Sequence, residues 1–493
     1  MKIPSGKEQL RSPPGGGRKK RRSTMDKFFK ISERGSNVRT EIVGGITTFF
    51  AMAYIIFVNP NTLCVNLNAG TGNPDFFPAM PGELWTPVLV ATCASAAIGC
   101  ILTALLANVP FAQAPGMGLN AFFTYTVCLG MGYTWQEALA IVLLSGALFL
   151  IIAVSPLRSK IISSIPAFLK NAISAGIGLF IAFIGLLNVN LISISGAVPA
   201  LNFQVPKLDE AGQVILDAAG NTVMTANMAG LLAIIGLLVT AILMCYKVKA
   251  AIVIGIVITT IIGFPMGVTA LPKSITMSGV TLAPVLFKMD FAGVFAKGIL
   301  PLVTAVVSFA LVDCFDTVGT LIGTATNAGM TDKRGNLPGG DRALIADAVA
   351  TCCGACMGTS TVTTFVESST GISEGARTGL SSIVVGVLFL LAILLAPVAG
   401  IIPSAATAPA LIIVGVLMLK GAVSIDWNDM ECAIPAFLTI AMMPFAYSIS
   451  DGIGFGFISY SIIKLARGKA KEVPVLVYII AALFVLKYVL TNI

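Results

Sequence analysis

The stretch GTSTVTTFVESSTGISEGARTG at residues 358–379 decides the fold class, because it places strand-forming residues inside a segment of membrane length. Residues 361–366 are almost all β-branched or aromatic, which favours extended backbone. At membrane depth, extended backbone is tolerated only where protein buries it or where it lines a water-filled cavity. The stretch therefore predicts a membrane protein with a broken helix beside a polar cavity, and Glu367 follows the break directly.

The composition supports a membrane protein over the whole chain. Of its 493 residues, 56% are hydrophobic and only 11% are charged, whereas a soluble globular protein has roughly 25% charged residues. This composition excludes a cytosolic enzyme, a nucleic-acid-binding protein and a disordered scaffold. It indicates an integral membrane protein that crosses the bilayer many times.

Apolar segments that could cross the bilayer recur along the chain. A membrane helix needs about 20 residues to cross about 30 Å of hydrocarbon. Fourteen spans are predicted, at residues 42–63, 86–107, 112–130, 138–154, 166–188, 228–246, 250–265, 297–327, 342–357, 360–377, 380–398, 408–421, 431–448 and 452–466. A further apolar segment at 473–491 either spans the membrane or lies at its interface.

A second helix break, NVPFAQAPGMG at residues 108–118, matches the first in position. The two breaks fall in the third and tenth predicted spans, which correspond if the chain is two repeats of seven spans. An odd number of spans inverts the second repeat, and paired broken helices in inverted repeats indicate the central site of a transporter. Half-helices that begin near mid-membrane would direct their positive ends toward that site.

The basic N-terminal tail predicts the orientation. Residues 1–41 hold 12 of the 31 Lys and Arg but only 4 of the 23 Asp and Glu, so the remaining chain is balanced. We interpret the tail as a solvated topology signal on the cytoplasmic side rather than an arm for nucleic acid or anionic lipid. The same side then receives Arg158, Lys160, Lys247, Lys249, Lys333, Arg334 and the cluster at 464–471, whereas the opposite loops at 64–85 and 189–227 have only Lys207. Met25 is typical of a natural start, which leaves open whether residues 1–24 are native.

Two further features are assigned no chemistry. Short apolar alternation with Pro and Gly-Asn at residues 189–227 predicts an extracellular hairpin that acts as a cover. Most of the 10 cysteines lie in apolar runs, where they pack as small hydrophobic residues. The single CxxC pair, Cys353 and Cys356, has no second pair, and the chain has no His, so no zinc site is expected.

Ionisable side chains at membrane depth are costly and usually functional. The leading candidates are Asp313, Asp316 and Glu367, while Asp347 near a span end and Glu374 are weaker. On a helix, Thr320 and Gly323 continue the face of Asp316, which suits a polar cavity. The alternative is a helix-packing stripe whose acids are satisfied by neighbouring helices. We favour the cavity for Asp316 and leave both interpretations open for Asp313.

The sequence resembles the nucleobase:cation symporter family, in its AzgA-like branch of hypoxanthine, adenine and guanine permeases. The resemblance covers most of the chain after Met25, in the order of the family. It rests on GGITTFFAMAYIIFVNP (44–60), APGMGLNAFF (114–123), DCFDTVGTL (313–321), GTSTVTTFVESSTGISEGARTGL (358–380) and IPAFLTIAMMPFAYSISDGIGFGFISY (434–460).

The resemblance implies an all-α membrane protein of 14 transmembrane helices, arranged as 7+7 inverted repeats with short strands in spans 3 and 10. After the tail at 1–41, it implies a core domain formed by residues 42–155 and 297–400. Residues 156–296 and 401–493 would form a gate domain. Gate-domain dimers occur in the wider fold family, so a homodimer is an open possibility.

The resemblance also implies import of purine bases with protons across the plasma membrane, by an elevator type of alternating access and without a cofactor. In the related uracil permease, an acid on span eight and another on span ten hold the base, and these fall on Asp316 and Glu367. Thr320 stands where the uracil and xanthine branches usually carry a His. Base selection and proton coupling therefore cannot be copied from those branches.

The residues themselves suit a purine. Carboxylates accept hydrogen bonds from its N–H groups, backbone amides of the broken spans donate to its ring nitrogens, and aromatic rings can stack on it. The expected substrate-binding residues are Asp316, Glu367, Thr320, Phe365, Val366, Phe122, Phe123 and Ala114. Burial disfavours a charged carboxyl group, so we expect Asp316 or Glu367, or Asp313, to carry the coupled proton.

Two other classes of protein are alternatives to a purine transporter. An anion transporter or channel on the same fold, like the sulfate permeases, would favour a positive site, which Asp316 and Glu367 oppose. An integral-membrane hydrolase would require a metal cluster or an activated nucleophile, and neither the His-free composition nor the residue spacing provides one. We therefore expect a transporter and not an enzyme.

Overall fold

The computed structural model describes residues 24–64, 79–155, 164–195, 198–206, 222–271, 280–332 and 337–491. The basic run at 18–22 and the loop charges Arg158, Lys160, Lys207, Lys333 and Arg334 lie outside these ranges.

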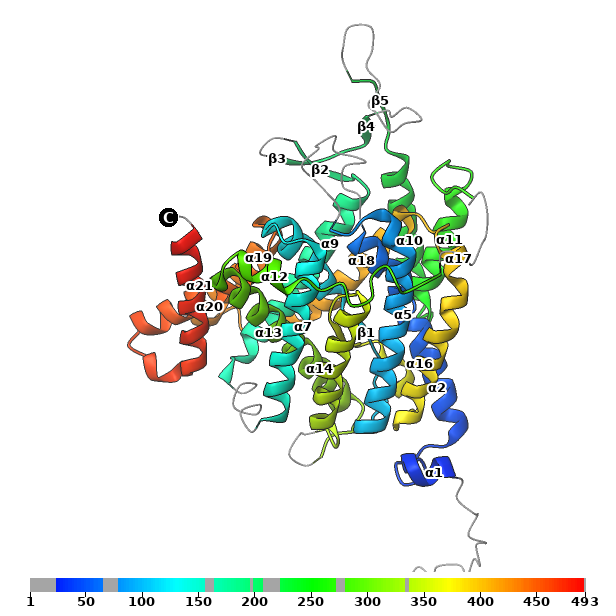
Figure 1. Cartoon of the computed structure of the whole chain (residues 1–493), viewed down its shortest axis with the longest axis horizontal. Helices are drawn as coiled ribbons and strands as arrows, with labels where there is room; N and C mark the ends of the chain where they lie inside the picture. The colour runs from blue at the N-terminus through cyan, green and yellow to red at the C-terminus, as the bar shows by residue number, and fades with distance from the viewer. Residues whose placement is uncertain are drawn as a thin grey trace, which may run out of the picture.

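The described chain is mainly a bundle of helices (Figure 1). The first half contains α1 Thr24–Phe29, α2 Val38–Met52, α3 Ile55–Leu63, α5 Trp85–Leu102, α6 Met117–Ala121, α7 Trp135–Val154, α9 Ala167–Asn188, α10 Met228–Cys245 and α11 Ala251–Gly263. The second half contains α12 Phe291–Ala296, α13 Ile299–Asn327, α14 Gly340–Met357, α15 Ser368–Ser373, α16 Gly379–Ala392, α17 Ala396–Ala399, α18 Ser404–Met418, α19 Met430–Phe445, α20 Ile449–Ala466 and α21 Val475–Thr491.

These helices match the predicted spans closely, because apolar length is a local property of the sequence. Within the described ranges, eight helical segments are long and apolar enough to cross a membrane. Three further apolar helices, α11, α19 and α21, are shorter. The structure therefore shows a mostly helical membrane protein, while the count of fourteen spans stays a prediction.

Both predicted helix breaks are confirmed, and they pair with each other. Strand β1, Gln113–Pro115, lies antiparallel to β6, Val362–Thr364, with Ala114 opposite Thr363. The ladder extends at both ends, because Gly116 N donates to Thr361 O at 3.0 Å and Phe365 N donates to Ala112 O at 3.0 Å. α5 and α14 pack against these strands, so the extended backbone is buried by protein as the sequence requires.

Each strand leads directly into a short helix. α6 and a π-helical segment, Phe122–Gly130, follow β1, and α15 follows β6. The helix starts therefore lie beside the strand pair, and its strand β1 lies near the middle of the bundle (Figure 1).

The described part of the N-terminal tail contacts the bundle through a few of its side chains. Phe29 and Ile31 are 6% and 1% exposed and pack with Ala104 and Leu380. The Arg34 guanidinium donates to the carbonyl groups of Asn108 and Arg377. Lys27, Lys30 and Arg39 are exposed, so most of the basic side chains of this segment face solvent while Phe29 and Ile31 anchor it on the bundle.

The loop at 189–227 contains β-structure, as predicted. β2 Ile192–Ser195 pairs with β3 Val198–Leu201, and β4 Gln204–Pro206 pairs with β5 Met224–Ala226. These two ladders extend from one end of the bundle, opposite the end that carries α1 (Figure 1). Residues 196–197 and 207–221 of this loop lie outside the described ranges.

Candidate functional site

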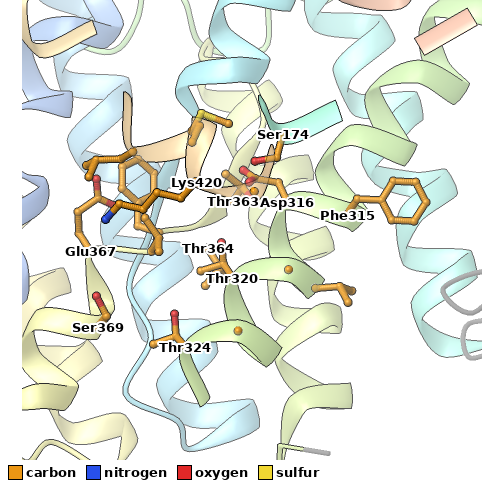
Figure 2. A pocket seen from close by; sticks show the side chains of 18 of the residues that line it. Ser174, Phe315, Asp316, Thr320, Thr324, Thr363, Thr364, Glu367, Ser369 and Lys420 are labelled. Carbon is orange, nitrogen blue, oxygen red and sulfur yellow. The ribbon is translucent and has the colours of Figure 1, made fainter. Parts of the chain in front are cut away.

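A cavity of about 1150 Å³ lies between β6–α15 and the helices α9, α13 and α18. Its polar lining includes Asp316 and Thr320 from α13, Thr363 and Thr364 from β6, and Glu367 (Figure 2). The α9 part of the wall, from Ala167 to Ile177, belongs to the half of that helix farther from the β2–β5 hairpins. The cavity therefore lies in the half of the bundle that is nearer to α1.

Glu367 is oriented by an aromatic residue from the first half of the chain. Tyr54, which lies between α2 and α3, is 1% exposed, and its hydroxyl donates to Glu367 Oε1 at 2.7 Å. The Tyr54 ring also lies near the Phe365 ring, with their centroids 6.5 Å apart. A hydrogen bond to a carboxylate is worth more than one between neutral groups. The contact therefore fixes where the acid points into the cavity.

The break after β6 places several predicted residues at the cavity wall. Phe365, Val366 and Glu367 follow the strand one after another, and all three line the cavity. Asp316 and Thr320 reach the same cavity because they share a face of α13. The structure therefore brings together five of the predicted substrate-binding residues.

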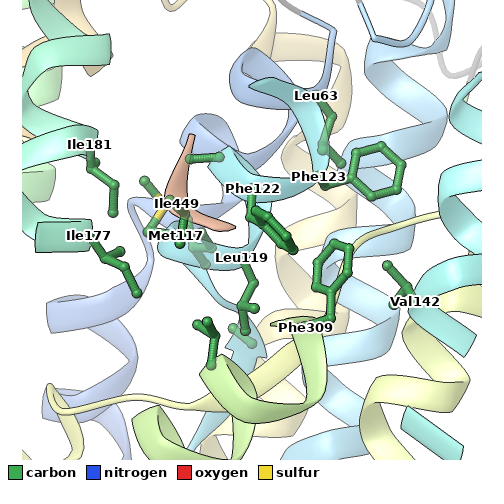
Figure 3. Close-up of a cluster of buried hydrophobic side chains, with 14 of the residues drawn as sticks. Leu63, Met117, Leu119, Phe122, Phe123, Val142, Ile177, Ile181, Phe309 and Ile449 are labelled. Carbon is green, nitrogen blue, oxygen red and sulfur yellow. The ribbon is translucent and has the colours of Figure 1, made fainter. Parts of the chain in front are cut away.

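Three predicted stacking or backbone residues lie elsewhere. Phe122 and Phe123 are 0% exposed and belong to the apolar core (Figure 3), where the Phe122 and Phe309 ring centroids are 4.5 Å apart. Ala114 is also 0% exposed and pairs with Thr363 in the strand ladder. None of the three lines the cavity. In this conformation Phe122 and Phe123 cannot stack on a ring bound in it, because the π-helical segment turns both side chains into the core.

A polar network buried behind the strand pair holds Asp347. Its Oδ1 accepts from Gln113 Nε2 at 3.0 Å and from the Thr364 hydroxyl at 2.9 Å. Its Oδ2 accepts from the Thr317 hydroxyl at 2.9 Å, and Thr317 Oγ1 lies 2.8 Å from Thr363 Oγ1. Asp347 is 0% exposed, so these donors replace water around a buried carboxylate. The network ties α13 and α14 to both strands.

Asp313 belongs to the same buried layer and does not line the cavity. Its side chain is 1% exposed, and its Oδ2 lies 3.0 Å from Thr351 Oγ1. The sequence left two interpretations open for Asp313, and the structure places it in contact with neighbouring elements.

Three cationic residues of the cavity wall were not predicted: Lys170 on α9, Arg377 after α15, and Lys420 after α18. Figure 2 shows the Lys420 side chain reaching toward Glu367. Lys170 lies within the predicted span 166–188, so the rule that selected the acids could also have found it. The cavity therefore carries both signs of charge.

The residues of the described ranges contain no group of three or more His, Cys, Asp or Glu that could hold a metal ion. All 10 cysteines are free, and Cys64, Cys93, Cys100, Cys128 and Cys314 are buried. The cavity thus offers carboxylates, hydroxyl groups, an aromatic ring and cations, which suit a small polar ring with N–H donors and ring-nitrogen acceptors.

Comparisons with known proteins identify relatives over nearly the whole chain. The model of the Permease family (Xan_ur_permease) matches residues 39–455. The guanine/hypoxanthine permease PbuG of Bacillus subtilis is 42% identical, over 94% of this chain and 99% of the relative. The adenine permease AdeP of Escherichia coli is 39% identical, over 94% of this chain and 96% of the relative.

A solved structure has a similar fold. The transmembrane domain of the cyanobacterial bicarbonate transporter BicA matches with a TM-score of 0.57 and 14% identity. The match covers 84% of this chain and 96% of that domain. At this level of identity the likeness shows the fold alone.

Proposed function

The chain belongs to the nucleobase permease family, and from this premise we propose that it imports purine bases by proton symport. The substrates we propose are adenine, guanine or hypoxanthine, since those are the bases named for its relatives. The single observation that carries the proposal is the convergence of Asp316, Glu367 and Phe365 on one cavity beside the paired strands.

The chemistry of these groups supports a purine. Glu367 and Asp316 can accept hydrogen bonds from ring and exocyclic N–H groups, and Thr320 can donate to a ring nitrogen. Phe365 can stack against the bicyclic ring. Residues of β6 and α15 line the same wall, and we propose that their backbone groups pair with the remaining edge of the base.

The proposed coupling uses a cavity acid as the proton carrier. Glu367 or Asp316 takes a proton on the outer side, which removes a negative charge and favours entry of a neutral base. On the inner side the open cavity admits water, which favours the charged carboxylate and release of the proton. We propose that the described conformation, whose cavity lies in the half of the bundle nearer to α1, is the inward-open state of a carrier with a cytoplasmic N-terminus.

The same proposal includes the finer architecture. Fourteen spans form 7+7 inverted repeats, and a core domain that contains both strands moves as an elevator against a gate domain. The gate elements are also the proposed contact of a homodimer. Labelling of single cysteines placed in the 189–227 loop and after α13, in intact cells, tests the orientation, because only the former should react from outside.

Transport by purified protein in proteoliposomes tests the function. We expect labelled purine to accumulate when the outside is more acidic, with proton entry reported by an enclosed pH dye. Glu367→Gln and Asp316→Asn should each reduce purine uptake strongly. Glu374→Gln is the matched control, because Glu374 pairs with Lys249 and does not line the cavity.

A thermal-shift panel of free bases gives an independent test, because a ligand that binds only the folded state stabilises it, by about 2.7 kcal/mol at 100 times its Kd. We expect purines to raise the melting temperature and uracil to leave it unchanged. Stabilisation by uracil but by no purine would contradict the proposal, as would co-transport of protons by both the Glu367→Gln and Asp316→Asn variants. Asp316 and Glu367 in the cavity wall oppose an anion as substrate, whereas the cations of the same wall favour one. Chloride or sulfate that competes with purine uptake would support the alternative of an anion transporter.

A further inference from the structure

The buried contact between Asp313, Thr351 and Val362 joins α13, α14 and strand β6. Asp313 is 1% exposed, and Thr351 and Val362 are both 0% exposed. Thr351 Oγ1 lies 3.0 Å from Asp313 Oδ2 and 2.9 Å from the carbonyl oxygen of Val362. Thr351 is therefore shared between a carboxyl group and a strand carbonyl.

The number of protons in this contact is limited. A threonine hydroxyl has one hydrogen to donate, and a backbone carbonyl can only accept. If Thr351 donates to the Val362 carbonyl, its contact with Asp313 is a hydrogen bond only when Asp313 donates. A protonated Asp313 thus gives each of the two contacts its own hydrogen, whereas an ionised Asp313 leaves two acceptors competing for one.

The surroundings of the two buried acids, Asp347 and Asp313, also favour a protonated Asp313. Asp347 accepts from three donors, Gln113, Thr364 and Thr317, which suits an ionised carboxylate. Asp313 Oδ1 is buried and has no hydrogen-bond partner among the side chains and backbone that the structure describes. An unpaired oxygen is far less costly in a neutral carboxyl group than in a charged one.

The other titratable groups around Asp313 favour the same arrangement. Asp347 on α14 and Asp316 on α13 act on it electrostatically, and the thiols Cys314 and Cys352 are its remaining titratable neighbours. Lys170 on α9 acts electrostatically on Cys314, which is the residue after Asp313. Since neighbouring carboxyl groups do not readily all ionise together, the group retains a proton.

We propose that Asp313 holds a proton in this conformation and that the Thr351 hydroxyl transmits the loss of that proton to strand β6. This inference rests on the proposed proton symport and adds Asp313, outside the cavity, as a buried site that exchanges the coupled proton with the cavity acid Asp316. When Asp313 ionises, its proton passes to water in the cavity by way of the Asp316 carboxyl group, one helical turn away. The Thr351 hydrogen then turns to Asp313 Oδ2, and the Val362 carbonyl loses its donor.

The strand provides the connection to substrate. Thr363 and Thr364 follow Val362 in β6, and both line the cavity together with Phe365. Loss of the bond at Val362 frees this wall to shift. Protonation of Asp313 would therefore hold β6 in the form that binds purine, and deprotonation would weaken binding.

Infrared spectroscopy of the purified full chain tests the protonation directly. A protonated carboxyl group has a carbonyl stretch separate from that of a carboxylate. We expect such a band near neutral pH in the unmodified protein and its loss in Asp313→Asn, whose amide can still donate to Thr351. A band that is absent, or that Asp313→Asn leaves unchanged, overturns the proposal. This readout does not depend on transport, so it remains decisive even if the protein moves no purine.

Transport tests the connection. For one proton per purine, a gradient of one pH unit supports about tenfold accumulation. We expect Asp313→Asn to bind purine, measured by thermal shift, but to bring purine only to equal concentrations on both sides. Thr351→Val, which removes the hydroxyl group, should also lose gradient-driven accumulation, and Thr351→Ser should retain it. Full accumulation by Asp313→Asn, or equal behaviour of the two Thr351 variants, contradicts the proposal.

Discussion

The hydroxyl of Tyr54 donates to Glu367 Oε1 at 2.7 Å, so a residue between two helices of the first half of the chain orients an acid of the second half. Tyr54 is 1% exposed, and both Tyr54 and Glu367 line the cavity. The contact joins the α2–α3 segment to the start of α15, so a movement of α15 relative to α2 and α3 would break it. It makes Tyr54 a positioning residue for the proposed purine site.

Tyr54→Phe should weaken purine binding without unfolding the protein. The variant keeps the ring next to Phe365 and removes only the hydroxyl donor. A hydrogen bond to a charged group contributes about 1.5–3 kcal/mol, so we expect the Kd to rise by about 10- to 100-fold. Isothermal titration with the purine that gives the largest thermal shift measures this change. Tyr125→Phe is the control, because the Tyr125 hydroxyl donates to Asn188 Oδ1 at 3.2 Å and Tyr125 does not line the cavity. A similar loss of purine affinity in Tyr125→Phe would argue against a specific role for Tyr54.

Asp347→Ala should destabilise the protein more than Asp347→Asn. Alanine leaves the donors of Gln113, Thr317 and Thr364 without their acceptor, and each unsatisfied buried group costs about 1–3 kcal/mol. Asparagine keeps one side-chain oxygen as an acceptor. We expect the melting temperature to fall in the order unmodified, Asn, Ala, as measured by thermal unfolding in detergent. Equal melting temperatures would show that the network does not hold the strands.

Local features of the sequence were enough to predict the helix breaks of the fold, but they predicted only part of the candidate site. Apolar length and the strand-forming run at 361–366 are properties of adjacent residues, and the helix breaks appeared where they were predicted. Asp316 and Thr320 were predictable because helical spacing places them on one face. Tyr54 was not predicted, because nothing about an uncharged aromatic residue in an apolar span indicates which residue it will contact. That partner is more than 300 residues away in sequence.

Two further differences have equally specific causes. Asp347 was ranked low because it was placed near the end of a span starting at residue 342. Helix α14 starts at Gly340, which puts Asp347 about two turns inside it. Phe122 and Phe123 were chosen because they follow the first break. Nearness in sequence does not determine side-chain direction, and both rings point into the core.

Phe365→Leu and Phe122→Ala should separate binding from stability. Phe365 lines the cavity, so its replacement removes a stacking surface worth about 0.5–1.5 kcal/mol beyond buried area. Phe122 packs in the core, and truncation of a buried Phe costs about 3–5 kcal/mol of unfolding free energy. We expect the first variant to raise the Kd for purine with only a small fall in the melting temperature, since Phe365 is 6% exposed and leucine keeps most of its apolar packing. The second variant should lower the melting temperature. If Phe122→Ala raised the Kd and Phe365→Leu did not, Phe365 would not be the residue that stacks on the purine.

Lys420→Gln should change purine uptake modestly and in a salt-dependent way. Lys420 is exposed at the cavity wall, and exposed charge pairs contribute about 0–1 kcal/mol. The ammonium group favours ionised carboxylates as the cavity opens, and this effect is screened over about 8 Å at physiological salt. We expect uptake by the variant to depend less on salt than uptake by the unmodified protein, with Lys249→Gln as an exposed control outside the cavity. An unchanged salt dependence would remove Lys420 from the mechanism.

Gly371→Ala should destabilise the protein, whereas Gly319→Ala should affect only the cavity. A Cβ atom at Gly371 would clash with the carbonyl oxygen of Gly44 and the hydroxyl of Thr48, so α15 could not keep its close approach to α2.

A Cβ at Gly319 would meet no atom within 4 Å, although Gly319 lines the cavity. Alanine is favoured over glycine in a helix by up to about 1 kcal/mol, so Gly319→Ala should keep or slightly raise the melting temperature. We expect it instead to alter the KM for purine, because the added methyl group occupies space at the proposed binding wall. A lower melting temperature for Gly319→Ala, with Gly371→Ala unaffected, would mean that the contact between α2 and α15 is not as close as the structure shows.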